Sequence, residues 1–260
     1  MYSITTDENV TVGFSGTPTE YETSGITAYK DENETQLPGL KYGDVLYAGN
    51  GDEVSLTLGN TPPEGFGFNG YTTTGGTLTC TENPYTLTMP DADVEIGATF
   101  EFLPNAILYL DMNGQQHYCV EYTTLDGSEN DYTLTAGWYV ADGTINFAGK
   151  ITVQGNVHLI LKDGAVVNVD TESDYGIGVG ANENYSLSIY AQSTGANKGQ
   201  LHVYGSKCGI YAIKSASVNI NGGQVTATGG TYGIYAYIGS VTINGGQVTA
   251  TGDTYGILAS

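Results

Sequence analysis

Three histidines and two acidic turns carry the side chains best suited to chemistry. His117, His158 and His202 lie far apart without the close spacing of a metal site, so solvated or strand-face histidines are the simpler interpretation. The runs DGSEND and DTESD offer clustered carboxylate oxygens, the ligands that calcium prefers. Neither run has the spacing of a known calcium loop, so each also reads as a solvated turn. Calcium is the one cofactor that the sequence suggests, with these candidate ligands: Asp126, Glu129, Asp131, Asp170, Glu172 and Asp174.

Tyrosines offer a different chemistry, the binding of sugar rings. Tyr211 and Tyr235 stand at matching places in the similar segments CGIY and YGIY, and Tyr237 follows two residues later. Tyr190 and Tyr204 are further candidates on other segments. A row of tyrosines presents a flat apolar surface with a polar rim, which suits a carbohydrate-binding site. The alternative is cross-strand stacking that only steadies a sheet.

The elements that must position these side chains form a repeat. Matching segments start at residues 157, 187, 218 and 241, separated by 30, 31 and 23 residues. Each segment is followed by two more short pieces rich in Val, Ile and Thr, with Gly or Asn at the corners. A strand triplet at this period is typical of a solenoid whose equivalent strands pair in parallel. We therefore predict an all-β, single-stranded parallel β-helix with three strands per coil, in preference to a β-sandwich.

Alternation along the strands predicts which side chains face the interior. In one coil the inward set is Val218, Ile220, Val225, Ala227, Ile234 and Ala236. On the third strand the outward side chains should form one column: Gly178, Tyr211, Tyr235 and Leu258. The repeated NGG segments make the corners, because Asn and Gly tolerate positive φ.

Three regions follow one another along the chain. Residues 1–103 hold 16 of the 28 carboxylates and read as a small β domain, residues 104–134 as a transition or cap, and residues 135–260 as the β-helix. The start of the chain lacks the basic and apolar stretches of a signal peptide, and the last repeat is incomplete. We therefore expect a piece of a longer multidomain protein, truncated at the C-terminus.

The net charge narrows the classes of partner, and the cysteine count limits the number of disulfides. The net charge is −21, from 28 carboxylates and seven lysines without an arginine. Such an acidic surface repels phosphate, so we expect neither nucleic acid nor an anionic membrane as a partner. Cys80, Cys119 and Cys208 allow one disulfide at most, and buried thiols are the simpler interpretation.

The first region carries the motifs of a known family. GDEVSLTLGNTPPEGFGFNGY at 51–71 and YTLTMPDADVEIGATF at 85–100 resemble the divergent InlB-type B repeat of bacterial surface proteins. Phe66 and Tyr71 replace the usual aromatic residues of that pattern. The resemblance implies an extracellular module, secreted or attached to the cell surface.

The third region has a resemblance of its own. GWYVADGTINFAGKITVQGNVHLILKDGAVVNV and the INGG coils behind it are similar to right-handed parallel β-helix modules. Such modules occur in secreted and surface proteins of anaerobic gut bacteria, where they are carbohydrate-binding or adhesin-like. The resemblance implies right-handed winding and display beside other modules, and it brings no defined catalytic residues.

Together these features predict a non-catalytic, monomeric module that binds a glycan, or a host or bacterial surface protein, through an outward face of the β-helix. The alternatives are a polysaccharide lyase or glycoside hydrolase with catalytic coils outside this chain, and a purely structural spacer. Lyases with this fold typically use an arginine, which this chain lacks. Glycoside hydrolysis needs two carboxylates, and Asp253 is the only acidic residue between Ser186 and Ser260.

Overall fold

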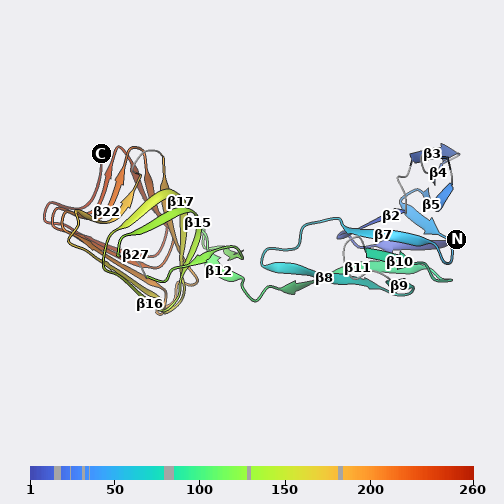
Figure 1. Ribbon diagram of the computed structural model, residues 1–260, viewed down its shortest axis with the longest axis horizontal. Helices are drawn as coiled ribbons and strands as arrows, with labels where there is room; N and C mark the ends of the chain where they lie inside the picture. Colours follow the sequence, from blue (N-terminus) through green and yellow to red (C-terminus); the bar gives the residue numbers. More distant parts are fainter. Residues whose placement is uncertain are drawn as a thin grey trace. The chain divides into compact units, whose positions relative to one another are not determined.

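The computed structural model is built from strands and turns (Figure 1), and the described residues contain no helix, as predicted. No described segment is therefore a helix long and apolar enough to cross a membrane. The chain divides into two compact units, Met1–Pro104 (unit 1) and Asn105–Ser260 (unit 2). The structure describes residues 1–14, 19–23, 25–30, 33–34, 36–78, 85–127, 130–180 and 184–260.

Unit 1 consists of two sheets. Its strands are β1 (Tyr2–Thr6), β2 (Val10–Phe14), β3 (Thr19–Thr23), β4 (Ile26–Lys30), β5 (Gln36–Tyr42), β6 (Val45–Ala48), β7 (Glu53–Leu58), β8 (Phe66–Thr73), β9 (Thr77–Leu78), β10 (Tyr85–Thr88) and β11 (Val94–Phe102). The larger sheet has the order β3-β4-β5-β6-β1-β11-β8, and the smaller has the order β2-β7-β10-β9. β1 pairs in parallel with β11, whereas the other pairs in this unit are antiparallel among the described residues.

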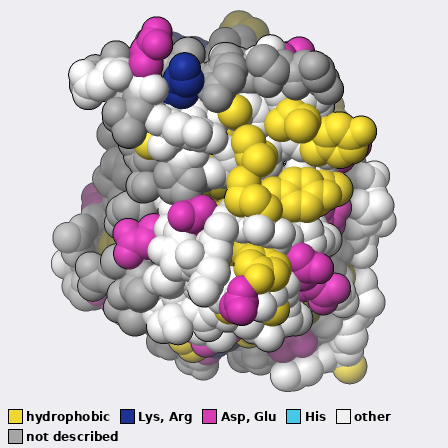
Figure 2. All heavy atoms as spheres, turned by 90° about the vertical axis from the view of Figure 1, so that its right-hand side faces the viewer, with side chains coloured by type: hydrophobic (Ala, Val, Ile, Leu, Met, Phe, Trp, Pro, Cys, Tyr) yellow, Lys and Arg dark blue, Asp and Glu magenta, His cyan; other side chains and the backbone are white. Residues whose placement is uncertain are grey.

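The core of unit 1 follows from alternation along these strands. Val54 and Leu56 on β7, and Val94 and Ile96 on β11, are buried two residues apart. Burial of each such side chain contributes about 1.5–3 kcal/mol. Glu53 and Glu95, which neighbour these buried positions, are exposed. Figure 2 shows one side of the molecule, where hydrophobic side chains gather in one area and Asp and Glu side chains lie near it. Unit 1 is thus a small β domain with its own core.

Unit 2 contains the predicted repeat. Its strands are β12 (Ile107–Leu110), β13 (Gln116–Cys119), β14 (Thr123–Thr124), β15 (Tyr132–Ala141), β16 (Thr144–Phe147), β17 (Ile151–Leu161), β18 (Val166–Asp170), β19 (Tyr175–Val179), β20 (Ser186–Ala191), β21 (Gln200–Gly205), β22 (Cys208–Ile213), β23 (Ser217–Ile220), β24 (Gln224–Gly229), β25 (Tyr232–Tyr237), β26 (Ser240–Ile243), β27 (Gln247–Thr251) and β28 (Tyr255–Ala259). From β14 onward, all the pairs between described strands are parallel.

The parallel pairs fall on three faces, and the chain visits them in turn. The first face joins the second half of β17 to β20, β23 and β26, and the third face joins the first half of β17 to β19, β22, β25 and β28. The second face has the order β16-β18-β21-β24-β27. This pairing is consistent with a parallel β-helix of three strands per coil and contradicts a β-sandwich. The right-handed winding stays a prediction.

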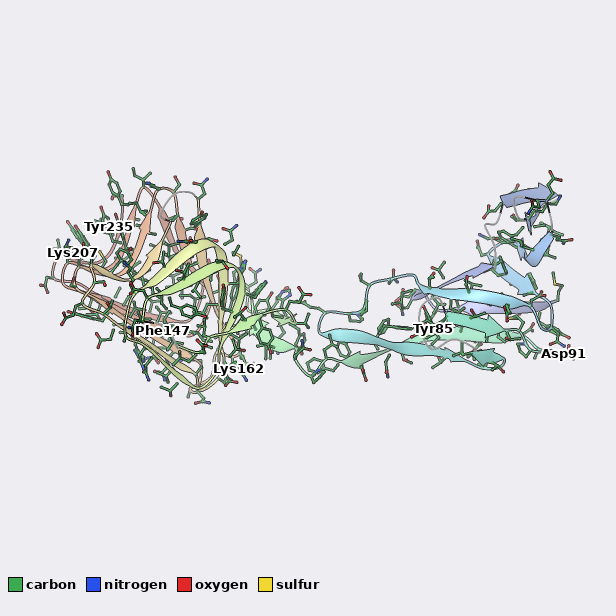
Figure 3. The ribbon with its side chains drawn as sticks, in the orientation of Figure 1. Tyr85, Asp91, Phe147, Lys162, Lys207 and Tyr235 are labelled. Carbon is green, nitrogen blue, oxygen red and sulfur yellow. The ribbon has the colours of Figure 1, made fainter. Side chains whose placement is uncertain are left out.

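The register matches the sequence repeat. Val157 pairs with Leu187, Leu187 with Val218, and Val218 with Val241, so equivalent positions lie over one another on the first face. The six predicted inward side chains of the coil from β23 to β25 are all buried. Phe147 also lies in this core (Figure 3). The interior of unit 2 is therefore a stack of matching apolar columns.

Glycine permits the sharp bend between the third and first faces within β17. Gly155 has a φ of 134°, and a Cβ atom there would lie 2.7 Å from the backbone nitrogen of Ala136. An L-residue with a side chain would meet both backbone strain and a clash. The same long strand can therefore contribute to two faces.

A hairpin precedes the coils. β12 and β13 pair antiparallel in register from Ile107 opposite Cys119 to Leu110 opposite Gln116. The parallel stack itself begins with β14 and β15, so coil pairing starts before residue 135. At the other end, Ile243 and Ile257 are 47 % and 41 % exposed, because no further described coil covers them.

Candidate functional site

Six tyrosines gather on the outer surface of the third face. The predicted column is confirmed, since Gly178 pairs with Tyr211, Tyr211 with Tyr235, and Tyr235 with Leu258. A second column runs beside it through Cys208, which pairs with Tyr175 and Tyr232. We call the whole set the Tyr array: Tyr175, Tyr211, Tyr232, Tyr235, Tyr237 and Tyr255.

The rings of the Tyr array contact one another continuously. The ring centroids of Tyr211 and Tyr235 are 5.5 Å apart, and those of Tyr232 and Tyr235 are 4.5 Å apart, both stacked. Tyr175 leans over Gly178, where a Cβ atom would lie 2.4 Å from its ring, and its centroid is 6.0 Å from that of Tyr211. Glycine at position 178 thus leaves the space that the Tyr175 ring fills.

Stacking determines what the Tyr array offers to a ligand. Rings that lie face to face cover much of each other, so Tyr211, Tyr232 and Tyr235 are half-buried and present mainly edges and hydroxyl groups. Tyr237 and Tyr255 are 46 % and 51 % exposed. Burial, followed by the neighbouring Tyr235, raises the pKa of Tyr211 above its ordinary value of 10.0. Its hydroxyl therefore remains a neutral donor and acceptor at physiological pH.

Paired charges border the Tyr array. Lys207 donates to Asp174 at 2.8 Å, and this contact raises the pKa of Lys207 (Figure 3 labels Lys207 and Tyr235). Lys150 lies 5.7 Å from the ring centroid of Tyr175 and 4.0 Å from Asp131. Asp174 and Asp131 therefore each have a lysine beside them.

The candidate calcium ligands are not brought together in the described part of the chain. There, no three His, Cys, Asp or Glu side chains form a group that could hold a metal ion. Asp174 and Asp131 have lysine partners, and Asp170 lies on the second face. Glu129 lies outside the described residues, while Asp126 and Glu172 are exposed. Calcium binding stays a prediction.

Tyr190 lies beneath the β12–β13 hairpin on the first face. Its ring centroid is 5.1 Å from that of Tyr109 on the hairpin and 5.4 Å from that of Trp138. Its hydroxyl is 3.3 Å from Nδ1 of His158, whose ring stacks on Trp138 at 4.4 Å. Burial lowers the pKa of His158. Tyr190 therefore belongs to a packed aromatic cluster, separate from the Tyr array.

Tyr204 lies on the second face, beside an open groove of about 770 Å³. The groove is lined by outward polar side chains of successive coils, among them Asn168, His202 and Thr226. Tyr204 is 42 % exposed and pairs with Asp170 and Thr228. The five tyrosines predicted as one kind of site thus divide among three faces.

The described cysteines are buried thiols. Among the described residues, neither Cys119 nor Cys208 forms a disulfide, and burial raises the pKa of Cys208. Cys80 lies outside the described residues. A raised thiol pKa lowers the fraction of reactive thiolate at neutral pH, so Cys208 is better suited to packing than to nucleophilic chemistry.

Sequence reasoning found half of the Tyr array and missed the other half. Tyr175, Tyr232 and Tyr255 stand three residues before the outward column, where strict alternation predicts an inward side chain. They begin their strands, at the corner after the second face, and therefore turn outward. The recurring YGI at these three places was the signal that could have identified them.

Comparison with known families confirms the resemblance of unit 1. Residues 40–102 match the family model described as the divergent InlB B-repeat domain. The match begins near the end of β5 and includes β6 through β11, a wider span than the motifs at 51–100. This family is typical of surface or secreted bacterial proteins, which is compatible with an extracellular location. Comparisons with curated proteins and with solved structures give no match.

Proposed function

We propose that this chain is a non-catalytic binding module of a bacterial surface or secreted protein, and that the Tyr array binds a neutral glycan. The InlB-type module in unit 1 supports the location. The observation that carries the binding role is the gathering of six tyrosines in mutual contact on one outward face. The described strands of the second face hold one tyrosine, Tyr204, among outward Thr, Gln, Asn and His side chains.

The chemistry of the array favours an uncharged sugar. Aromatic edges with hydroxyl groups combine apolar contact with hydrogen bonding, which matches the alternating CH and OH groups of a pyranose. The net charge of −21 disfavours polyanionic ligands. An extended glycan lying across the coils would meet Tyr211 and Tyr235, which belong to neighbouring strands. A protein partner that docks on the same tyrosines is the second candidate.

Two exposed tyrosines allow a matched test of this proposal. Tyr237 belongs to the array and is 46 % exposed, whereas Tyr204 lies on the second face and is 42 % exposed. Tyr237→Ala should weaken binding on a glycan array of neutral sugars, and Tyr204→Ala should leave it unchanged. The double variant Tyr211→Ala with Tyr235→Ala should abolish binding, with folding checked by circular dichroism. A blank array for the wild-type chain would instead favour a spacer or a protein-binding adhesin.

The enzyme and calcium alternatives have separate tests. A hydrolase or lyase would release reducing or unsaturated sugars from pectin and related polymers, and the proposal expects neither product. Calcium at the acidic turns would make EDTA lower the melting temperature, and added calcium would restore it. If the Tyr array has only a structural role, the wild-type chain should bind no glycan, and Tyr211→Ala should still lower the free energy of unfolding.

A further inference from the structure

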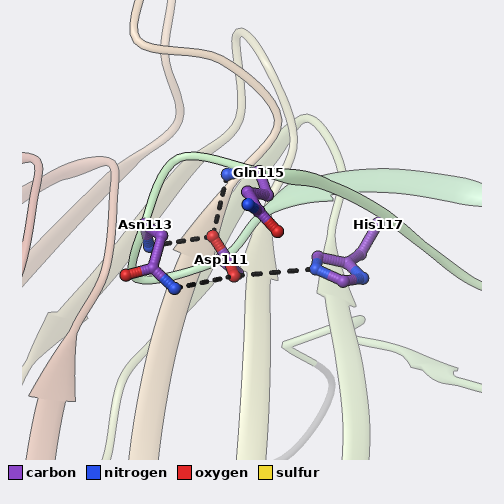
Figure 4. A network of polar contacts seen from close by, with 4 residues as sticks. All are labelled: Asp111, Asn113, Gln115 and His117. Atoms are coloured by element: carbon purple, nitrogen blue, oxygen red, sulfur yellow. Dashed lines mark hydrogen bonds and ion pairs between the residues drawn. The ribbon is translucent and has the colours of Figure 1, made fainter.

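The tip of the β12–β13 hairpin is held in one conformation by its own polar contacts (Figure 4). Oδ1 of Asp111 accepts the backbone N–H groups of Asn113 and Gln115, each at 2.8 Å. Oδ2 of Asp111 lies 3.6 Å from Nε2 of His117 and 3.4 Å from Nδ2 of Asn113. The N–H of Gln115 is the main cause of the lowered pKa of Asp111. The carboxylate of Asp111 therefore fixes the conformation of the tip, and its oxygens are directed at other residues of the same hairpin.

The hairpin is also fixed against the coils. The ring of Tyr109 packs on Trp138 at 4.8 Å and on Tyr190 at 5.1 Å, measured between centroids. Tyr109 immediately precedes Leu110, the last residue of β12. The position of the tip relative to the coil corners is therefore set by packing.

The facing wall is formed by the repeated NGG corners between the first and second faces. Gly223 has a φ of 81°, and a Cβ there would lie 3.0 Å from Cδ1 of Leu161. Asn244 donates from Nδ2 to Oδ1 of Asn221 at 2.8 Å. Within the described part of the chain, Nδ2 of Asn221 and Oδ1 of Asn244 form no hydrogen bond. One donor and one acceptor on adjacent coils thus remain available to a ligand.

A cleft of about 470 Å³ lies between the tip and these corners. This volume is within the range of small-molecule sites, about 300–1,000 Å³. Polar side chains line it from several directions, including Asn113, Ser193 and Gln247, and Met112 supplies an apolar surface. The lining also includes one charge of each sign, Asp111 and Lys198.

We infer that this cleft is a second binding site of unit 2, which takes the adjacent hydroxyl groups of a neutral sugar residue. A donor and an acceptor on stacked asparagines match a pair of neighbouring hydroxyls, each of which can both donate and accept. The rigid tip and the fixed corners reduce the ordering cost of binding. The site lies between the first and second faces, so it does not depend on the Tyr array of the third face.

The test measures the side-chain amide signals of Asn221 and Asn244 by NMR during titration with methyl glycosides of glucose, galactose, mannose and N-acetylglucosamine. Saturable shifts at these signals are expected with at least one glycoside. Asn244→Ala should weaken that affinity about two- to tenfold, the effect of one neutral hydrogen bond. Asn221→Asp keeps the shape of the side chain and the oxygen that accepts from Asn244, but it replaces the available Nδ2 donor with an oxygen. It should weaken the affinity as well and guards against misfolding in the first variant.

Asn168→Ala is the matched control, because Asn168 donates to Asn146 at 2.8 Å in a similar ladder on the second face, outside the cleft. It should leave the affinity unchanged. Tyr237→Ala should also leave the cleft signals unchanged, so failure of the Tyr array would not affect this result. The inference is overturned if no glycoside produces saturable shifts, or if Asn244→Ala and Asn221→Asp both bind like the wild type.

Discussion

Two isoleucines at the same place in neighbouring coils allow the solenoid interior to be tested quantitatively. Ile234 on β25 pairs with Ile210 on one side and with Ile257 on the other. Ile234 is fully buried, whereas Ile257 in the last coil is 41 % exposed. The two residues have the same type and column, and they differ in whether a further coil covers them. Ile234→Ala and Ile257→Ala should therefore have very different costs.

The magnitudes follow from burial. Replacing a fully enclosed isoleucine with alanine removes its transfer free energy and leaves a cavity, which together cost about 2–5 kcal/mol. At Ile257 part of the side chain is already in water, and the space left behind is open to solvent. The cavity term then disappears and the transfer term is reduced, so we expect about 1 kcal/mol. The difference between the two variants should be at least about 1 kcal/mol.

Urea unfolding followed by tryptophan fluorescence measures this difference. Trp138 is the only tryptophan and lies in unit 2, so the signal reports that unit alone. The slope of the transition should stay constant between the variants, which verifies that the same unit unfolds. Equal costs for the two substitutions would refute the reasoning, because they would mean that Ile257 is as enclosed as Ile234.

Three further predictions concern a titration, a thiol and a corner glycine. Burial lowers the pKa of His158, so the unfolded state takes up the proton before the folded state as pH falls below 6.5, and the free energy of unfolding should decrease there. The protonated ring should quench the fluorescence of the stacked Trp138 with a midpoint below pH 6.5, and this quenching should vanish in His158→Gln. Cys208 should react slowly with a thiol reagent at neutral pH and quickly in urea, since burial raises its pKa. Gly223→Ala should destabilise unit 2 by more than about 1 kcal/mol in the same urea assay, because φ is positive and Leu161 is close.

The coils could be predicted because every coil places apolar side chains at the same inward positions. Val218 and Val241 are the same residue at matching places in the repeat, and they pair directly in the structure. A register error of one residue would turn such a column outward, so burial specifies the register strongly. The parallel pairing, the inward set and the column through Tyr211 and Tyr235 were therefore predictable from spacing alone.

The hairpin and the cleft were not predictable in the same way. Contact between Tyr109 and Tyr190 joins segments 81 residues apart with no repeat to relate them. The sequence marked the NGG corners as structural, which the positive φ of Gly223 supports. It gave no indication that Asp111 would lock a tip opposite Asn221 and Asn244. Such long-range placement depends on aromatic packing outside the coils.

The outward surfaces show why a repeated interior does not imply a repeated function. One outward column of the second face runs through Asn146, Asn168, His202, Thr226 and Thr249. Its residue type changes twice along these coils, from Asn to His and from His to Thr, while the neighbouring inward column stays apolar from Phe147 to Ala250. Packing constrains the interior on every coil, whereas each outward position varies without disturbing the stack. Six tyrosines in contact on one face, against this background of variation, are therefore stronger evidence for a binding role than any single tyrosine would be.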